Sequence, residues 1–225
     1  TDRARHDEDA VAKIIADLRW LGLDWDEGVR LGPDGAVTGD GPNGPYRQSE
    51  RLNMYTEHIE RLLSAGRAYY AFDTAEELDA LRKRAEADKM TFRYRRPEAL
   101  PTAEDAERAA AEGRPVVVRL RNPGRDVTIH DDAFGAVTMP AEAQDDFILR
   151  KADGWPTYHL ANVVDDALMG VTYVCRGQEF LGQTWRHVLL REALGYPEPG
   201  YCHLPLIMDM QGRKLSKRDG AVEVH

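Results

Sequence analysis

The sequence contains little cysteine and no long apolar stretch. Only two of its 225 residues are cysteines, Cys175 and Cys202, which excludes a framework of several disulfides and provides no zinc-finger spacing. No apolar run approaches the roughly 20 residues that a membrane span needs, and no signal-peptide pattern opens the sequence. We therefore expect a protein of the reducing cytoplasm without a membrane partner.

Basic charge is also in short supply. The chain carries 30 Lys and Arg against 39 Asp and Glu, a formal net charge of −9, while 42% apolar residues are ordinary for a folded protein. This balance excludes a diffuse attraction for nucleic acid. Any contact with RNA must come from local basic patches, of which the sequence offers two: Arg93, Arg95 and Arg96 in the first, and Arg119 and Arg121 in the second.

A third basic run lies near the C-terminal end of the sequence. Residues 213–218 read Arg-Lys-Leu-Ser-Lys-Arg and follow the apolar run 203–208 and a turn at 209–212. A lysine on such a loop acts as a movable point charge that suits the phosphates of a nucleotide. From spacing alone, a solvated basic turn is an equally good interpretation.

Helical periodicity dominates the first half of the sequence. It predicts amphipathic helices over residues 7–21 and 50–65, a strand over 68–72, and helices over 74–88 and 102–112. Thr74 with Glu77 predicts a capping box at the start of the third helix, and Gly66 predicts the C-cap of the second. The glycine-rich stretch 28–44 is expected to be a loop.

The second half changes character twice. Short strands are predicted over 116–120, 127–130, 136–139 and 147–149, which indicates a small antiparallel region. The pattern then becomes helix 158–168, strand 172–175, helix 178–194 and strand 201–208, which is typical of a parallel α/β sheet. Two such strands make an incomplete sheet, so we expect its other strands to come from outside this chain or from a preceding part.

Four segments together resemble the bacterial glutamyl-tRNA synthetases. They are Leu18–Glu27, Pro45–Arg51, Pro156–Asp166 and Lys214–Arg218, and the last resembles the KMSKS signature of class I synthetases. The resemblance runs in order along essentially the whole chain. Each segment alone is a weak signal, but the combination is specific.

The resemblance implies a fold and an activity. The fold would be α/β, a Rossmann-like catalytic domain split by an inserted mixed α+β domain that binds the acceptor end of tRNA. Residues 1–65 and 148–225 would belong to the catalytic domain, and residues 66–147 to the insertion. The activity would be ATP-dependent ligation of L-glutamate to the 3′ end of tRNA(Glu) through glutamyl-adenylate, with Mg²⁺ accompanying ATP.

The resemblance also assigns roles to residues of this sequence. Tyr158, Asn162 and Arg176 match glutamate-binding positions, and a guanidinium is a planar partner for the glutamate side-chain carboxylate. Lys214 and Lys217 match the lysines that stabilise the reacting phosphates. The residues that match the ATP-binding region are Glu179, Leu206, Ile207, Lys214, Leu215, Ser216 and Lys217.

The chain also departs from the family pattern. The HIGH signature of the family is absent from this sequence. Ala71-Phe72-Asp73 stands where many relatives carry a Cys-x-Cys zinc motif, so no zinc or other metal site is expected. The sequence starts at Thr1 and stops at His225, directly after the basic run. We expect a piece of a longer, monomeric enzyme, and we expect this piece alone to be inactive.

Other interpretations remain open. Tyr158 is compatible with a core aromatic and Arg176 with a surface ion pair to Glu179, while the histidines have no metal-ligand spacing and are interpreted as structural. The pairs Asp131-Asp132 and Asp145-Asp146 are interpreted as turns. The alternative functions are a short paralogue that glutamylates a tRNA anticodon base, and a non-catalytic RNA-binding or regulatory module with the same fold.

Overall fold

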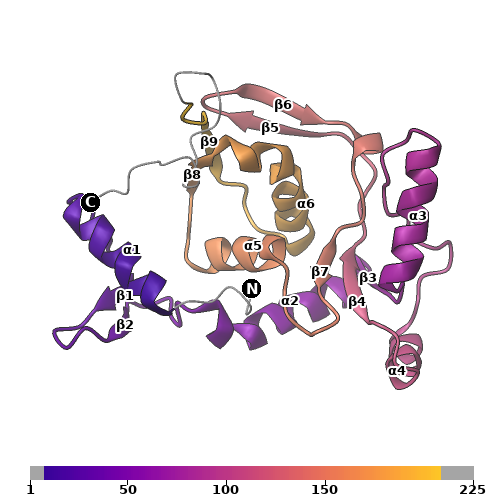
Figure 1. Ribbon diagram of the computed structural model, residues 1–225, viewed down its shortest axis with the longest axis horizontal. Helices are drawn as coiled ribbons and strands as arrows, with labels where there is room; N and C mark the ends of the chain where they lie inside the picture. The colour runs from indigo at the N-terminus through magenta and orange to yellow at the C-terminus, as the bar shows by residue number, and fades with distance from the viewer. Residues whose placement is uncertain (1–7, 209–225) are drawn as a thin grey trace. The chain divides into compact units, whose positions relative to one another are not determined.

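A computed structural model describes residues 8–208 of the chain, which fold as a mixture of helices and strands (Figure 1). Residues 52–204 form one compact unit, and the described residues 8–51 and 205–208 belong to a second. The basic run 213–218 lies outside the described residues. Among those that are described, no helix is both long and apolar enough to cross a membrane.

The smaller unit contains helix α1 (Glu8–Trp20), a β-hairpin and a short 3-10 turn, η2 (Gln48–Glu50). The predicted helix over residues 7–21 is confirmed by α1. The predicted loop over residues 28–44 is wrong in its first part, because β1 (Gly28–Leu31) and β2 (Val37–Asp40) pair as antiparallel strands. A local turn joins them: Gly35 adopts a φ of 80°, and the Asp34 carboxylate accepts the Ala36 amide at 3.0 Å. The strands are too short to show an alternating pattern in the sequence.

One end of the larger unit is a three-stranded antiparallel sheet in the order β3-β4-β7. Its strands are β3 (Ala68–Ala71), β4 (Val117–Leu120) and β7 (Ile148–Arg150), and the helices of this region are α2 (Leu52–Ser64), α3 (Ala75–Ala87) and α4 (Ala103–Ala111). These elements confirm the predicted helices and strands. Thr74 and Glu77 form the predicted capping box, and Thr102 forms a second one with Asp105.

The other sheet has four strands in the order β6-β5-β9-β8. These are β5 (Val127–Asp131), β6 (Gly135–Met139), β8 (Tyr173–Gly177) and β9 (Gly200–Leu204). As predicted, β8 and β9 are parallel, with a helix between them in the chain. One expectation was wrong: a partner for β9 comes from the middle of this chain, because β5 pairs with β9 in parallel through Asp131 and Tyr201. Residues alternate between buried and exposed along β5, which allows Val127 and Ile129 to join the core.

Two helices pack against one another in the core of this unit, α5 (Tyr158–Leu168) and α6 (Thr184–Leu194) (Figure 1). The helix predicted over 178–194 is α6 preceded by a 3-10 segment, η4 (Gln178–Gln183). The strand predicted over 201–208 ends early, at Leu204, because Pro205 has no amide hydrogen to extend the ladder. Trp185 of α6, 2% exposed, contacts Phe147 edge to face.

The strand pairings do not follow the predicted boundary between residues 147 and 148. The strands β3 and β4 share one sheet with β7, which pairs with β4, while β5 and β6 share the other sheet with β8 and β9. Segments 66–147 and 148–204 are therefore joined by both sheets within one compact unit. The assignment of 66–147 as an inserted tRNA-binding domain stays a prediction.

Candidate functional site

Arg176 is the centre of the candidate site. It lies near the C-terminal end of β8, where β8 pairs in register with β9 and Arg176 faces His203. The carboxyl ends of parallel strands are where open α/β sheets bind ligands. The guanidinium donates from Nε to His203 Nε2 at 3.1 Å and from Nη2 to Thr184 Oγ1 at 2.8 Å. Two of its three nitrogens are thus held by the protein.

The third nitrogen of the guanidinium faces Tyr158. Tyr158 is the first residue of α5 and is 38% exposed. Arg176 Nη1 lies 3.3 Å from that hydroxyl, and the tyrosine ring lies 5.8 Å from the ring of Phe180. The structure therefore brings together two of the three residues that were predicted to bind glutamate.

Within the part of the chain that is described, no carboxylate contacts the guanidinium of Arg176 directly, although the Asp166 carboxyl lies close enough to interact with its charge. Its neighbours are Phe180, whose ring centre lies 5.2 Å from the guanidinium carbon, and the imidazole of His187, whose Nδ1 lies 3.4 Å from Nη1. The surface ion pair with Glu179 that the sequence left open is absent from the contacts of Arg176. A half-buried cation with only neutral partners is suited to bind an anion.

The two histidines of the site are held neutral. Burial lowers the pKa of His187 well below its ordinary value, and the positive charge of Arg176 lowers it further. Burial, with the charges of Arg186 and Arg176, lowers the pKa of His159 to about 4. His187 Nε2 and His159 Nδ1 lie 3.1 Å apart. The guanidinium is therefore the charged group of this cluster at neutral pH.

Asn162 and Glu179 lie close in sequence to these residues. Asn162 is half-buried on α5, one turn after Tyr158. Glu179 lies in η4 and its carboxylate folds against the backbone of Gly177, so that a β-carbon at Gly177 would collide with it. Leu206 and Ile207 belong to the smaller unit, where Ile207 is 75% exposed. The remaining ATP-side residues, Lys214, Leu215, Ser216 and Lys217, lie outside the described residues.

The sequence profile described as "tRNA synthetases class I (E and Q), catalytic domain" matches residues 1–225. The chain belongs to this family. It is 46% identical over 219 residues to the "Glutamate--tRNA ligase" of Thermus thermophilus, covering 97% of the chain and 44% of the relative. It is 40% identical over 227 residues to that of Finegoldia magna, covering 100% of the chain and 46% of the relative.

A solved structure of the family shows the same fold. The crystal structure of a glutamate tRNA ligase from Elizabethkingia meningosepticum, in complex with its amino acid, matches 97% of this chain and 44% of its own, with a TM-score of 0.83 and 38% identity. The mixed α/β fold of a class I synthetase catalytic domain is thereby confirmed. The chain spans less than half the length of the relatives that it matches.

The neutral state of His159 makes the stability of this synthetase domain depend on pH. Because the pKa of His159 falls from 6.5 to about 4 on folding, the unfolded chain binds more protons between these values. The stabilisation is complete above pH 6.5 and is lost as the pH falls toward 4, by about 3 kcal/mol for this group alone. Urea unfolding at about pH 7 and about pH 4.5 should show a smaller loss for His159→Gln than for the wild type. Equal losses would contradict a neutral, half-buried His159.

The predicted RNA-binding arginines fall into two classes. Arg119 is 5% exposed: it lies over the ring of Tyr94, 3.5 Å from its centre, and donates to the carbonyl oxygen of Asp146 at 2.8 Å. Arg93 donates to the carbonyl oxygen of Ala143 at 2.8 Å. Both guanidiniums make hydrogen bonds within the protein, so their surroundings do not favour the prediction that they contact RNA.

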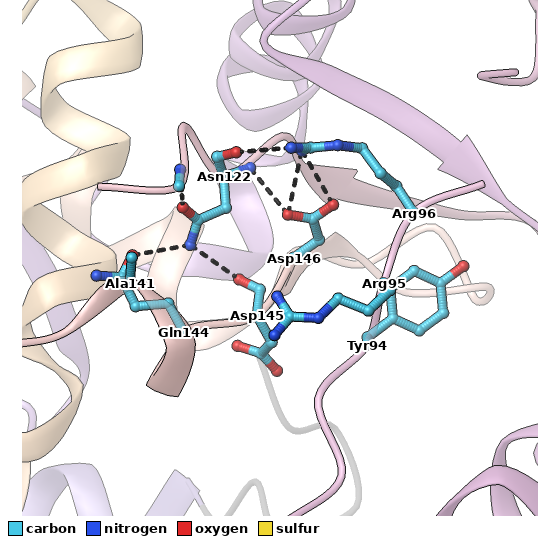
Figure 2. A pocket seen from close by; sticks show the side chains of 9 residues that line it. Tyr94, Arg95, Arg96, Asn122, Ala141, Gln144, Asp145 and Asp146 are labelled. Atoms are coloured by element: carbon cyan, nitrogen blue, oxygen red, sulfur yellow. Dashed lines mark hydrogen bonds and ion pairs between the residues drawn. The ribbon is translucent and has the colours of Figure 1, made fainter. Parts of the chain in front are cut away.

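A small pocket of about 150 Å³ lies beside these residues (Figure 2). Arg96 pairs there with the carboxylate of Asp146 at 3.2 Å and donates to the carbonyl oxygen of Asn122. Arg95 also lines this pocket, and Figure 2 draws no dashed line from it to the other residues shown. The interpretation of Asp145-Asp146 as a turn was wrong for Asp146, which is buried and also accepts the Tyr69 hydroxyl at 2.7 Å.

The contrast between Arg119 and Arg121 can be measured. Arg119→Ala should lower the free energy of unfolding by about 2–4 kcal/mol, because a buried hydrogen-bonded cation and its contact with Tyr94 are removed together. Arg121→Ala is the matched control: this side chain is exposed, so stability should change by less than about 0.5 kcal/mol. Urea unfolding measures both. Equal effects of the two substitutions would contradict the structural role of Arg119.

Sequence reasoning missed the polar side chains that surround Arg176. Thr184, His187 and His203 lie 8, 11 and 27 residues from it in the chain, and none belongs to a recognisable motif. Among residues 8–208, no group of three or more His, Cys, Asp or Glu side chains is arranged to hold a metal ion. The interpretation of the histidines as structural residues without a metal stays a prediction. The absence of zinc from the protein stays a prediction.

Proposed function

We propose that the protein carrying this chain is a glutamate–tRNA ligase, which activates L-glutamate with ATP and transfers it to the 3′ end of tRNA. One observation carries the proposal: the guanidinium of Arg176 is held at a strand end beside the Tyr158 hydroxyl, without a carboxylate in direct contact among the described residues. The names of the relatives at 40% and 46% identity agree with a site built for an acidic amino acid.

The chemistry of the first step requires binding and charge stabilisation rather than a base. The α-carboxylate of glutamate is ionised at neutral pH and attacks the α-phosphorus of ATP, which forms glutamyl-adenylate and releases pyrophosphate. Arg176 binds the side-chain carboxylate, and Tyr158 and Asn162 contact the same amino acid. The bound orientation leaves the α-carboxylate as the only nucleophile presented to ATP.

The ATP side of the site is proposed from the resemblance. Lys214 and Lys217 stabilise the charge that develops on the phosphates, and Mg²⁺ accompanying ATP supplies further neutralisation. Leu215 and Ser216 belong to the same segment. By the same resemblance, Glu179, Leu206 and Ile207 match the positions around the adenosine.

We also propose that residues 66–147 bind the acceptor end of tRNA. Of the five predicted arginines, Arg95 and Arg121 are the exposed ones. Arg121 lines a hollow of about 410 Å³ together with Arg67 and Arg96, and the guanidinium of Arg96 is paired with Asp146. Clustered guanidiniums favour phosphate contact. The tRNA contact is therefore assigned to Arg95 and Arg121, with Arg67 added.

The other functions gain less support. A paralogue acting on an anticodon base would use the same glutamate site, but the similar proteins from Thermus thermophilus and Finegoldia magna carry the name of the ligase. A regulatory module without catalysis would have no need for a half-buried guanidinium that no carboxylate contacts directly, because such a group is costly to maintain without a ligand.

The experiment that tests the proposal is amino-acid-dependent ATP–pyrophosphate exchange. It is run with tRNA present on the protein as its whole gene encodes it. Glutamate should support exchange, whereas aspartate and glutamine should support it at least about a hundredfold less, since a site built for a charged group rejects analogues that leave it unpaired. Exchange that favours glutamine or requires no amino acid would refute the assignment.

A further inference from the structure

A buried carboxylate and a buried imidazole stand behind Arg176. Asp131 ends β5 and His203 lies in β9, and both side chains are 0% exposed. His203 Nδ1 lies 2.6 Å from Asp131 Oδ2, and the His203 amide donates to the same oxygen at 3.0 Å. The other oxygen accepts the amides of Ala133 and Phe134. The interpretation of Asp131 as a turn residue was therefore incomplete: its carboxylate caps the turn from inside the sheet.

Asp131 carries a negative charge at neutral pH. Burial acts to raise its pKa, but the hydrogen bonds from His203 and from three backbone amides outweigh burial and lower the pKa below its ordinary value. A carboxylate that accepts so many donors stays ionised inside a protein.

The position of the ring proton on His203 follows from its neighbours, which are Asp131 at Nδ1 and, at Nε2, both Arg176 Nε and Thr184 Oγ1, the latter 3.2 Å away. An arginine nitrogen can only donate, so His203 Nε2, 3.1 Å from Arg176 Nε, must be the acceptor. The proton of the neutral ring is then on Nδ1, where it is donated to Asp131. A continuous chain of hydrogen bonds thus runs from β5 through β9 to β8, from Asp131 through His203 to Arg176.

We propose that His203 and Asp131 are positioning residues that aim Arg176 at the side chain of glutamate. The proposal rests on the proposed function. Nε of Arg176 is anchored by His203 and Nη2 by Thr184, at 3.1 and 2.8 Å. The contacts of Nη1 are longer, 3.3 and 3.4 Å, so this is the edge of the guanidinium that a carboxylate can engage.

The imidazole of His203 separates the carboxylate of Asp131 from the guanidinium of Arg176. A carboxylate paired directly with Arg176 would occupy the guanidinium edge and neutralise the charge that attracts the substrate. His203 fixes the same orientation as a neutral acceptor, while the Asp131 charge one residue further away keeps the imidazole proton on Nδ1. Orientation is provided without competition for the ligand.

The substitution Asp131→Asn tests this chain with nearly the same shape. The amides of Ala133 and Phe134 retain the asparagine oxygen, so its amide group faces His203 Nδ1 and moves the ring proton to Nε2, directly against Arg176 Nε. The hydrogen bond from the His203 amide to the second oxygen is lost in this variant. The KM for glutamate should rise about tenfold or more, since a charge-assisted hydrogen bond is lost, while the KM for ATP stays within about twofold. Asp132→Asn is the matched control, because Asp132 is exposed and its carboxylate accepts a hydrogen bond from the Tyr173 hydroxyl. This variant should change neither the KM for glutamate nor the KM for ATP.

A second pair of variants separates positioning from folding. His203→Gln keeps an acceptor for Arg176 Nε and should retain more glutamate affinity than His203→Leu, with folding followed by thermal unfolding. Loss of glutamate and ATP affinity in equal measure, or no difference between Gln and Leu, would overturn the positioning role.

A spectroscopic measurement distinguishes this inference from the proposed function. Long-range ¹H–¹⁵N correlation of the imidazole should show His203 protonated on Nδ1 in the wild type and on Nε2 in Asp131→Asn. Nε2 protonation in the wild type would refute the chain of hydrogen bonds, whatever the activity. If the tautomers are as expected but the protein does not activate glutamate, the proposed function fails, and with it the role of this chain in binding glutamate.

Discussion

Arg176→Ala is expected to lower kcat/KM for glutamate by about a hundredfold to a thousandfold in ATP–pyrophosphate exchange. The substitution removes the cation that would pair with the side-chain carboxylate, and the loss of one partner from such a pair costs several kcal/mol. The KM for ATP should change little. Preference for glutamate over glutamine should disappear, because the alanine site holds no charge for the carboxylate to meet.

Arg176→Lys separates charge from geometry. Lysine keeps the charge but not the planar fork, nor the Nε contact with His203, so its activity should fall between alanine and the wild type. Arg125→Ala removes an exposed arginine that pairs with Glu192, and serves as the control for loss of a cation. Glutamate activation that survives unaltered in Arg176→Ala would show that this residue is not the glutamate ligand.

Lys217→Ala is expected to slow the formation of glutamyl-adenylate by about a hundredfold to a thousandfold. A group aimed at charge that develops in the transition state acts on the rate more than on ground-state binding, so the KM for glutamate should change much less. Rapid-quench measurement of adenylate in a single turnover gives this rate directly.

The control for Lys217→Ala is Lys151→Ala, which removes an exposed lysine paired with Asp153. Its single-turnover rate should equal that of the wild type. A Lys217→Ala rate within about threefold of the wild type would place the phosphate-stabilising charge elsewhere. The basic run would then be the solvated turn that its spacing alone allows.

Local signals in the sequence predicted local structure. Thr74 with Glu77 and the amphipathic pattern of 50–65 depend on residues within a few positions of each other, and both predictions are confirmed. The parallel pairing of β5 with β9 joins residues far apart in the chain, Asp131 and Tyr201, and no local pattern indicates it. The hairpin of residues 28–40 was missed because its four-residue strands give too few alternations.

The residues of the candidate site also fall into those that the sequence indicated and those that depend on long-range strand pairing. The resemblance to a family identified Tyr158 and Arg176, which the fold brings within hydrogen-bond distance. His203 and Asp131 escaped because their roles depend on the register of three strands. The exposure of Arg119 and Arg121 was not predictable from the sequence either. Alternation along a strand would place both side chains on the same face of the sheet. Because β4 ends at Leu120, Arg119 is buried and Arg121 is exposed.

The central claim is that the protein attaches glutamate to the 3′ end of tRNA. The most direct measurement is transfer of labelled glutamate to tRNA by the protein as its whole gene encodes it, with intact tRNA compared with tRNA whose 3′ terminal ribose has been oxidised by periodate. We expect label in intact tRNA that is released by mild alkali, as an ester is, and no label in oxidised tRNA. Alkali-stable label, or label that persists after oxidation of the 3′ end, would contradict it.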